Sequence, residues 1–179
     1  ALRPSRRFRL PGGRPARVGA APLPRRRAGQ PRILRLTTAL FEGAPPDAPP
    51  DAALLLATTT GAIERTEQQV LTGQGRPEEA RLSELLPAVQ EQAGLRGPAA
   101  VVSAACASST AALWHAGRML RDGETDAVLV VGADALSEFL VSGFASLMAL
   151  DEKAARPFDR DRAGLNPGEA AGYLLLMSA

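Results

Sequence analysis

The sequence predicts an α/β fold in which a mixed, mainly parallel sheet carries helices on both faces. Three short, continuous apolar runs predict strands that are covered on both faces, namely Ala53–Ala57, Pro98–Ala105 and Asp126–Val131. Segments with helical spacing of apolar residues alternate with these runs, which favours parallel strands joined by helices. A chain of 179 residues with 45% hydrophobic residues is long enough for one globular domain with a substantial core.

The first 31 residues predict no regular element. Residues 1–35 hold 11 of the 21 basic residues and no acidic residue. Proline recurs six times between Pro4 and Pro31, which excludes the amphipathic helix of a targeting segment. No aromatic residues are interleaved with the arginines to stack on nucleic-acid bases. We therefore expect a basic, poorly ordered leader over 1–31, with a basic surface for an acidic partner such as a carrier protein as the alternative.

The remaining elements follow in order along the chain. Glycines mark helix ends, as at Gly43 and Gly94. Helices are predicted over Ile33–Phe41, Ala62–Thr72, Glu78–Ala93, Ala107–Arg121 and part of Ser137–Leu150. After the three apolar runs, a loop is predicted over Ala155–Pro167 and a last strand over Ala171–Met177, while Ala44–Pro50 is a linker by composition.

The helix predicted over Ala107–Arg121 is unusual in its charge. From Ala107 to Gly117 it carries no charged residue unless His115 is protonated. A helix that is apolar on all sides is buried on all sides, and one layer of sheet can cover only one of them. We therefore expect something beyond this sheet to cover the rest. At about 100° per residue, His115 lies about 180° around the helix from Cys106, so we expect a buried or interface histidine that cannot reach the thiol.

A single cysteine limits both the chemistry and the compartment. Cys106 cannot form an intrachain disulfide and has no CxxC spacing for zinc, so we expect a reducing, cytoplasmic compartment. No apolar run approaches the roughly 20 residues that span a membrane, and no signal-peptide core precedes a cleavage site. The glycines at 164, 168 and 172 lack the strand–GxGxxG–helix context of a dinucleotide site, so no nucleotide cofactor is expected.

Cys106 is the candidate nucleophile, because it lies where a predicted strand passes into a predicted helix. The first N–H groups of a helix have no partner within the helix, so they favour a thiolate and can donate to a developing oxyanion. Ala105 and Ala107 are small enough to let a thioester approach, and Ser108 could satisfy free backbone groups of the first turn. The alternative is that a lone cysteine among alanines only fills the core.

The segment Ser103–Ser109 (SAACASS) resembles the nucleophile segment of β-ketoacyl synthases, a family of the thiolase superfamily. Further blocks follow in family order, so that the resemblance covers about residues 95–177; residues 53–94 match weakly and 1–31 do not match. These blocks are Gly123–Ala127, Val131–Asp134, Phe144–Leu150, Arg156–Asp159 and Arg162–Gly172. The chain departs from the family pattern at Ser109, Leu165 and Ala170, and the first two of these could narrow or reshape an acyl channel.

The resemblance implies the first half of a thiolase-like architecture, with the Cys106 helix buried as the central layer between two halves. It implies acyl transfer from acyl carrier protein to Cys106, followed by attack of a carbanion made by decarboxylating a malonyl-carrier unit. The family takes two histidines, a supporting lysine and a Gly-rich loop for this chemistry from a C-terminal half that is absent here. Substrates travel on phosphopantetheine, so no cofactor or metal is expected, and neither nucleic acid nor membrane is an expected partner.

Five residues fall on family-like positions that support the nucleophile: Ala107, Ser108, Asp134, Phe158 and Glu169. We expect Asp134 and Glu169 to brace loops beside the site rather than to transfer protons. Residues 32–179 would then form an incomplete β-ketoacyl synthase N-terminal domain of fatty acid or polyketide synthesis, inactive without a C-terminal half or companion subunit. The resemblance also implies a homo- or heterodimer. The alternatives are a non-catalytic partner that binds carrier protein, against which the retained Cys106 argues, and a truncated remnant.

Overall fold

The computed structural model describes residues 3–10, 12–23 and 29–178, and the chain divides into two compact units. The sheet unit comprises Leu23–Ala135 and Ala170–Ala179, and the hairpin unit comprises Ala1–Pro22 and Leu136–Glu169. This division differs from the expected leader over 1–31 followed by a single domain over 32–179. The difference arises because the start of the chain clusters with a segment more than 100 residues further on.

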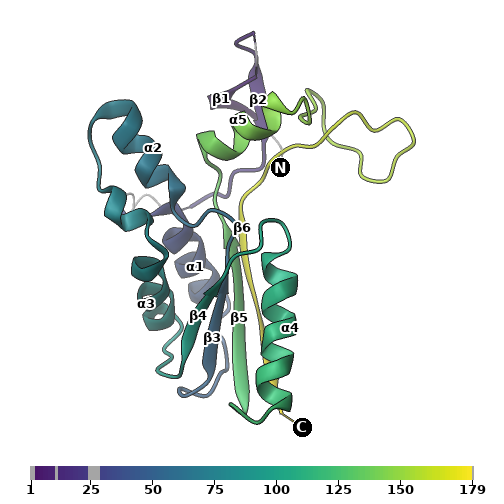
Figure 1. Ribbon diagram of the computed structural model, residues 1–179. Coiled ribbons are helices and arrows are strands. Elements are labelled where there is room, and N and C mark those ends of the chain that lie inside the picture. The colour runs from purple at the N-terminus through teal and green to yellow at the C-terminus, as the bar shows by residue number, and fades with distance from the viewer. Residues whose placement is uncertain (1–2, 11, 24–28, 179) are drawn as a thin grey trace. The chain divides into compact units, whose positions relative to one another are not determined.

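The sheet unit is built on four strands in the order β4-β3-β5-β6 (Figure 1). These strands are β3 (Ala53–Ala57), β4 (Ala99–Val102), β5 (Ala127–Asp134) and β6 (Ala170–Met177). Strand β3 runs parallel to both β4 and β5, so that Leu55 pairs with Ala100 on one side and Val130 on the other, whereas β6 is antiparallel to β5. The predicted mixed, mainly parallel sheet is confirmed.

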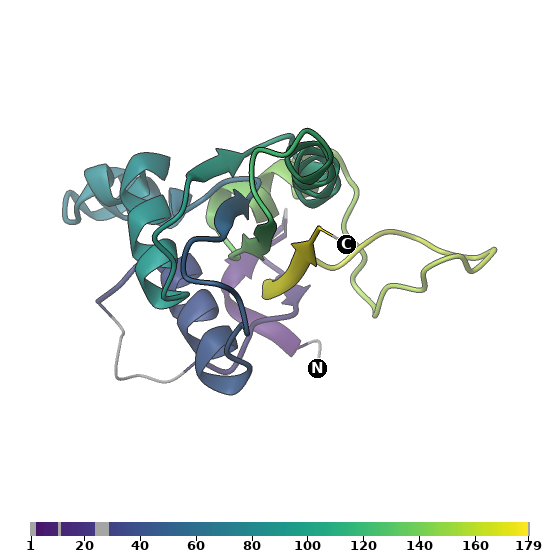
Figure 2. The ribbon, with the colours of Figure 1, turned by 90° about the horizontal axis from the view of Figure 1, so that it is seen from below.

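Helices cover both faces of this sheet, as predicted. Figures 1 and 2 show α4 (Ser108–Arg121) on one side of the strands and α1 (Arg32–Gly43) with α3 (Leu82–Gln92) on the other. Successive side chains of a strand point to opposite faces. Leu54 and Leu56 therefore join the core under α1 and α3, while Leu55 packs with the side of α4 that faces the sheet. All five residues of β3 are buried, which explains its continuous apolar run.

The segment between β3 and α3 differs from the prediction. Helix α2 (Ile63–Thr72) lies close to the predicted bounds, but the single helix expected over Glu78–Ala93 is divided. A 3-10 turn, η2, spans Pro77–Ala80, and Arg81 has extended dihedral angles (φ −65°, ψ 133°) before α3 begins. The spacing of apolar residues predicted a helix but did not indicate a break at Arg81. Pro77 did not indicate one either, because proline is acceptable in the first turn of a helix.

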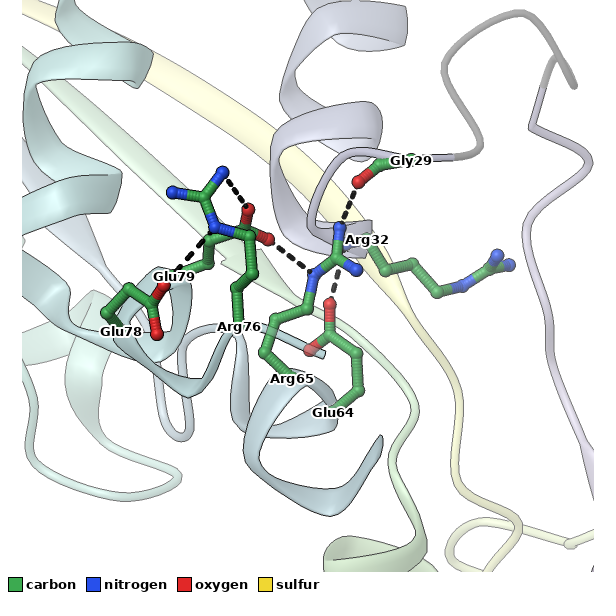
Figure 3. Close-up of polar contacts among 7 residues, drawn as sticks. All are labelled: Gly29, Arg32, Glu64, Arg65, Arg76, Glu78 and Glu79. Atoms are coloured by element: carbon green, nitrogen blue, oxygen red, sulfur yellow. Dashed lines mark hydrogen bonds and ion pairs between the residues drawn. The ribbon is translucent and has the colours of Figure 1, made fainter. Parts of the chain in front are cut away.

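Charged side chains connect α2 to η2 and to the start of α1 (Figure 3). We call this set the arginine–glutamate cluster; its members are Arg32, Glu64, Arg65, Arg76, Glu78 and Glu79. Glu79 lies 3.2 Å from Arg65 Nε and 3.5 Å from an Nη atom of Arg76. Glu64 Oε1 accepts a hydrogen bond of 2.7 Å from the backbone N–H of Arg32, the first residue of α1. A carboxylate is favourable there because the first N–H groups of a helix have no acceptor within it.

The hairpin unit contains β1 (Arg3–Arg9), β2 (Pro15–Val18) and α5 (Glu138–Ser146). Strands β1 and β2 are antiparallel, so the expectation of a poorly ordered leader is wrong for these residues. Phe8 and Val18 are buried with Val141 of α5, which shows that a few inward apolar residues suffice to order a strongly basic segment. Its arginines also find acidic partners, since Arg7 lies 3.4 Å from Glu138. The arginines at positions 25–27 lie outside the described residues.

Two kinds of functional feature are absent from the part of the chain that the structure describes. Among the helices of residues 3–10, 12–23 and 29–178, none is long and apolar enough to cross a membrane. Within the same ranges, no group of three or more His, Cys, Asp or Glu side chains is arranged to hold a metal ion.

Candidate functional site

Cys106 lies in the short turn that joins β4 to α4. The strand ends at Val102 and the helix begins at Ser108, so the sulfur precedes the helix by two residues. Ala105 has a φ of +49°, in the left-handed region that residues with a Cβ rarely adopt. Two backbone hydrogen bonds close the turn, from Ala107 N–H to the Ala104 carbonyl (3.0 Å) and from Ser108 N–H to the Ala105 carbonyl (3.1 Å). The turn leaves Cys106 exposed beside a helix N-terminus.

The buried side chain of Ser108 stabilises this turn through hydrogen bonds to its backbone. It is buried, with 4% of its surface exposed, and its Oγ accepts a hydrogen bond of 2.9 Å from the Ala104 N–H. The same hydroxyl lies 2.7 Å from the Ala105 carbonyl and 3.3 Å from the Thr58 carbonyl, to either of which it can donate. We expected Ser108 to satisfy free backbone groups of the first helical turn. The structure instead directs its side chain back to residues that precede the helix, and Ala107 makes no side-chain cap.

Asp134, at the end of β5, accepts hydrogen bonds from the turn that follows β3. Its Oδ1 accepts from the Thr59 N–H (2.8 Å) and the Thr58 hydroxyl (2.9 Å), and its Oδ2 lies 2.9 Å from Thr59 Oγ1. Thr59 Oγ1 is also 3.2 Å from the Ala105 carbonyl. We call Asp134, Thr58, Thr59, Ser108 and Ala105 the Asp134 network. Asp134 thus braces a loop beside the nucleophile turn, in the manner expected.

Thr58 and Thr59 are parts of the site that sequence reasoning missed. They directly follow a buried strand, and parallel strands β3, β4 and β5 all present their carboxyl ends at the same edge of the sheet. A polar residue after β3 and an acidic residue at the end of β5 must therefore lie close to the turn that leaves β4. That reasoning was available from the predicted strands and the Thr58–Thr60 run.

The remaining supporting residues, Phe158 and Glu169, belong to the hairpin unit. Glu169 is buried and accepts hydrogen bonds from the backbone N–H groups of Ala21 (2.6 Å) and Leu136 (3.2 Å), so it braces two segments within that unit. Phe158 is fully exposed and has a φ of +64°. The structure thus brings Cys106, Ala107, Ser108 and Asp134 together in the sheet unit, and places Phe158 and Glu169 in the other unit.

Helix α4 is covered on one side. Ser108, Ala112 and Ala116 are buried against the sheet, whereas Trp114 is 66% exposed. The uncharged part of α4 before Arg118 is thus covered by this sheet on one side, and the expectation that something beyond the sheet covers the rest stays a prediction. His115 is exposed, so the prediction that this chain buries it is wrong, and the alternative of an interface remains.

The fold and the turn together define a thiolase-like α/β protein with an exposed cysteine just before helix α4. Residues 41–179 match the family model described as "Beta-ketoacyl synthase, N-terminal domain". The chain belongs to the β-ketoacyl synthase family.

Curated relatives include a 3-oxoacyl-[acyl-carrier-protein] synthase and a polyketide β-ketoacyl synthase. The chain is 39% identical over 90 residues to 3-oxoacyl-[acyl-carrier-protein] synthase 2 of Vibrio cholerae, a match that covers 46% of this chain and 22% of the relative. It is 42% identical over 88 residues to the oxytetracycline polyketide putative β-ketoacyl synthase 1 of Streptomyces rimosus, with 45% and 20% covered. These matches therefore span about a fifth of each relative.

Solved structures extend the likeness to the whole chain. The ketosynthase ApeO in complex with its chain length factor ApeC, from Xenorhabdus doucetiae, matches with a TM-score of 0.79 and 26% identity over 100% of this chain and 50% of that one. The ishigamide ketosynthase/chain length factor matches with a TM-score of 0.73 and 22% identity over 98% of this chain and 51% of that one. The predicted thiolase-like half-fold is confirmed, and the chain spans half the length of these structures.

Proposed function

We propose that Cys106 accepts an acyl group from a carrier-protein thioester, as the first step of ketosynthase chemistry. The observation that carries this proposal is the place of its sulfur, which is exposed on a tightly held turn two residues before a helix that packs on the sheet. In a filler role the thiol would be buried. The hydroxyls of Thr59 and Ser108 contact the backbone of this turn, and the Asp134 carboxylate in turn holds Thr59.

The proposed transfer is an exchange of thioesters. The Cys106 thiolate attacks the carbonyl carbon of the incoming thioester, and helix N–H groups can donate to the oxyanion that forms. The new Sγ–C bond forms as the C–S bond to phosphopantetheine breaks, and the released thiolate takes up the proton that Cys106 gave up. The acyl group arrives on the carrier's own arm, so the step needs no cofactor bound by this chain.

We propose that the later condensation needs groups from another polypeptide segment. The sequence contains one histidine, His115, which lies seven residues into α4 from Ser108, about 10 Å along the helix axis at 1.5 Å per residue. It cannot act at the thiol, and the family resemblance implies two histidines there. The chain by itself is therefore expected to load acyl groups without forming carbon–carbon bonds, and condensation by the purified chain would contradict this.

Two partners follow from the proposal. One is an acyl carrier protein; a related type II polyketide ketosynthase has been solved in complex with its acyl-carrier protein. The other is a ketosynthase-type segment or subunit that covers the exposed side of α4, where Trp114 lies. A non-catalytic role for this chain is not favoured, because the cysteine is present and accessible.

The test uses octanoyl-pantetheine as the acyl donor and intact mass spectrometry as the readout. The wild-type chain should gain one octanoyl group, which neutral hydroxylamine should remove as expected for a thioester. The variant Cys106→Ala lacks the chain's single thiol and should gain none, whereas Ser146→Ala, an exposed site in the hairpin unit, should load like the wild type. Octanoylation that persists in Cys106→Ala would refute the assignment.

A further inference from the structure

We propose that Thr59 is a positioning residue for Cys106 and acts by holding the Ala105 carbonyl. The inference deepens the proposed function and rests on it, since it concerns the turn that carries the acyl acceptor. Thr59 lies on the turn after β3, far from Cys106 in sequence, and its hydroxyl is 3.2 Å from the Ala105 carbonyl oxygen. Ala105 directly precedes the cysteine.

The backbone conformation of Ala105 needs stabilising contacts. Its φ of +49° is unfavourable for a residue with a Cβ, and such a conformation persists only where the surroundings fix it. Its carbonyl accepts from the Ser108 N–H at 3.1 Å and lies 2.7 Å from Ser108 Oγ, both within the same turn. Thr59 provides the contact to this carbonyl from another segment of the sheet unit. The Thr59 contact therefore fixes the position of the Cys106 turn on the sheet, whereas the Ser108 contacts to this carbonyl fix only the internal shape of the turn.

Asp134 sets the position of Thr59. The carboxylate accepts from the Thr59 N–H at 2.8 Å and lies 2.9 Å from its hydroxyl oxygen. The hydroxyl has one proton, so it donates either to Asp134 Oδ2 or to the Ala105 carbonyl at any moment, while the N–H bond stays in place. Asp134 thus fixes the backbone of Thr59. This places the Thr59 hydroxyl within hydrogen-bonding distance of the Ala105 carbonyl oxygen.

The neighbouring Thr58 does not serve the same purpose. Its hydroxyl donates to Asp134 at 2.9 Å and accepts from the Gly61 N–H at 3.0 Å, so both contacts close its own turn. Only its backbone carbonyl approaches the nucleophile segment, 3.3 Å from Ser108 Oγ. Among the threonines of this turn, Thr59 is the one whose side chain reaches the residue before the cysteine.

The test measures the second-order rate of alkylation of Cys106 by iodoacetamide in the full chain. Thr59→Val keeps the shape and the N–H bond to Asp134 but removes the hydroxyl, and should slow alkylation about fivefold, the effect of one net hydrogen bond on the population of the reactive turn. Thr59→Ser should restore the wild-type rate. The matched control is Thr72→Val at the end of α2, whose hydroxyl donates to the Gln68 carbonyl and whose loss should leave the rate unchanged.

A second variant tests the mechanism itself. Glycine adopts a positive φ without strain, so Ala105→Gly should reduce the need for the Thr59 hydroxyl. In that background, Thr59→Val should slow alkylation less than twofold. The proposal is overturned if Thr59→Val alkylates at the wild-type rate, if Thr59→Ser is as slow as Thr59→Val, or if Ala105→Gly leaves the effect of Thr59→Val undiminished.

The alkylation rate separates this inference from the proposed function. If the wild-type chain takes no octanoyl group from octanoyl-pantetheine, the proposed function fails, yet the alkylation series still shows whether Thr59 positions the thiol. If octanoyl loading at Cys106 succeeds and the Thr59 variants alkylate like the wild type, the positioning role alone is wrong.

Discussion

Within the sheet unit, the Asp134 network and the arginine–glutamate cluster both join segments through carboxylates, but they differ in donors and in exposure. Asp134 accepts from backbone N–H and hydroxyl groups of three successive threonines, Thr58–Thr60, at the end of the sheet, where Thr58 is buried. In the other cluster, Arg76 and Glu78 approach to 3.2 Å with side chains that are 71% and 47% exposed (Figure 3). The first set surrounds the turn of Cys106. The second connects α2 to η2, and its exposure varies, since the side chains of Arg65 and Glu79 are 13% and 26% exposed.

The difference shows which kind of contact can fix a reactive group. Hydrogen bonds from backbone and hydroxyl donors are directional, and losing an acceptor in a partly buried place leaves those donors unpaired. Ion pairs between long exposed side chains are screened by water and salt and tolerate several geometries. We therefore expect changes in the Asp134 network to affect both stability and the reactivity of Cys106, and changes in the arginine–glutamate cluster to affect stability slightly and reactivity not at all.

The largest effect is expected from Asp134→Ala. It leaves the Thr58 hydroxyl and the Thr59 N–H without their acceptor, and should lower the free energy of unfolding by about 3 kcal/mol. Urea unfolding measures this loss. Asp122→Ala is the matched control, because that carboxylate makes an exposed ion pair with Arg118 in the preceding turn, the last of α4, and its loss should cost about 0.5 kcal/mol. If the two variants lowered the free energy of unfolding equally, the hydrogen bonds of Asp134 would contribute no more than an exposed ion pair.

A smaller effect is expected from Ser108→Ala. The substitution leaves the Ala104 N–H unpaired beneath the turn, and should lower the free energy of unfolding by about 1.5 kcal/mol. It should also slow iodoacetamide alkylation of Cys106, since the Ala105 carbonyl loses its nearest donor. Ser109→Ala, at the neighbouring exposed position, provides the control for stability. A Ser108→Ala chain with wild-type stability and alkylation would show that the hydroxyl holds nothing.

The two regions also differ in how far the sequence predicted them. The strands around Cys106 could be predicted because β3 and β5 are buried on both faces, so Ala53–Ala57 and Ala127–Val131 are continuous apolar runs. The turn followed from the position of Cys106 between a strand and a helix. What the sequence could not provide was the left-handed φ of Ala105, since alanine carries no signal for it.

The arginine–glutamate cluster lay beyond prediction for a different reason. The two adjacent acidic residues between basic residues in Arg76–Arg81 are compatible with a helix, with a 3-10 turn or with a loop, and only tertiary contacts with α2 decide between them. The hairpin of β1 and β2 was missed in the same way. The hairpin packs Phe8 and Val18 against Val141, which lies more than 100 residues further along the chain. The local sequence around β1 and β2 cannot predict such a long-range contact.

A still smaller effect is expected from Glu79→Gln. Glu79 approaches Arg65 at 3.2 Å and Arg76 at 3.5 Å, and the loss of its charge should lower the free energy of unfolding by about 0.5–1 kcal/mol. In 1 M salt the part of this difference that comes from Arg76 should shrink, because mobile ions screen the exposed Arg76 more than the largely buried Arg65. Alkylation of Cys106 should keep its wild-type rate. A slower alkylation in Glu79→Gln would mean that the two clusters are coupled.

The smallest effect concerns the protonation of Glu78. A hydrogen bond from its own backbone N–H, with a further one from Arg76, holds the pKa of this carboxyl below its ordinary value of 4.5. Because the pKa is lower in the folded state, the ionised group stabilises the fold above pH 4.5, and this contribution is lost as the pH falls through the lowered value. The difference in unfolding free energy between wild type and Glu78→Gln should therefore be present at pH 7 and decline in acid. Arg76→Gln should reduce that difference without abolishing it, because the backbone hydrogen bond remains. A difference that grew on acidification would reverse the sign of the linkage and contradict the assigned contacts.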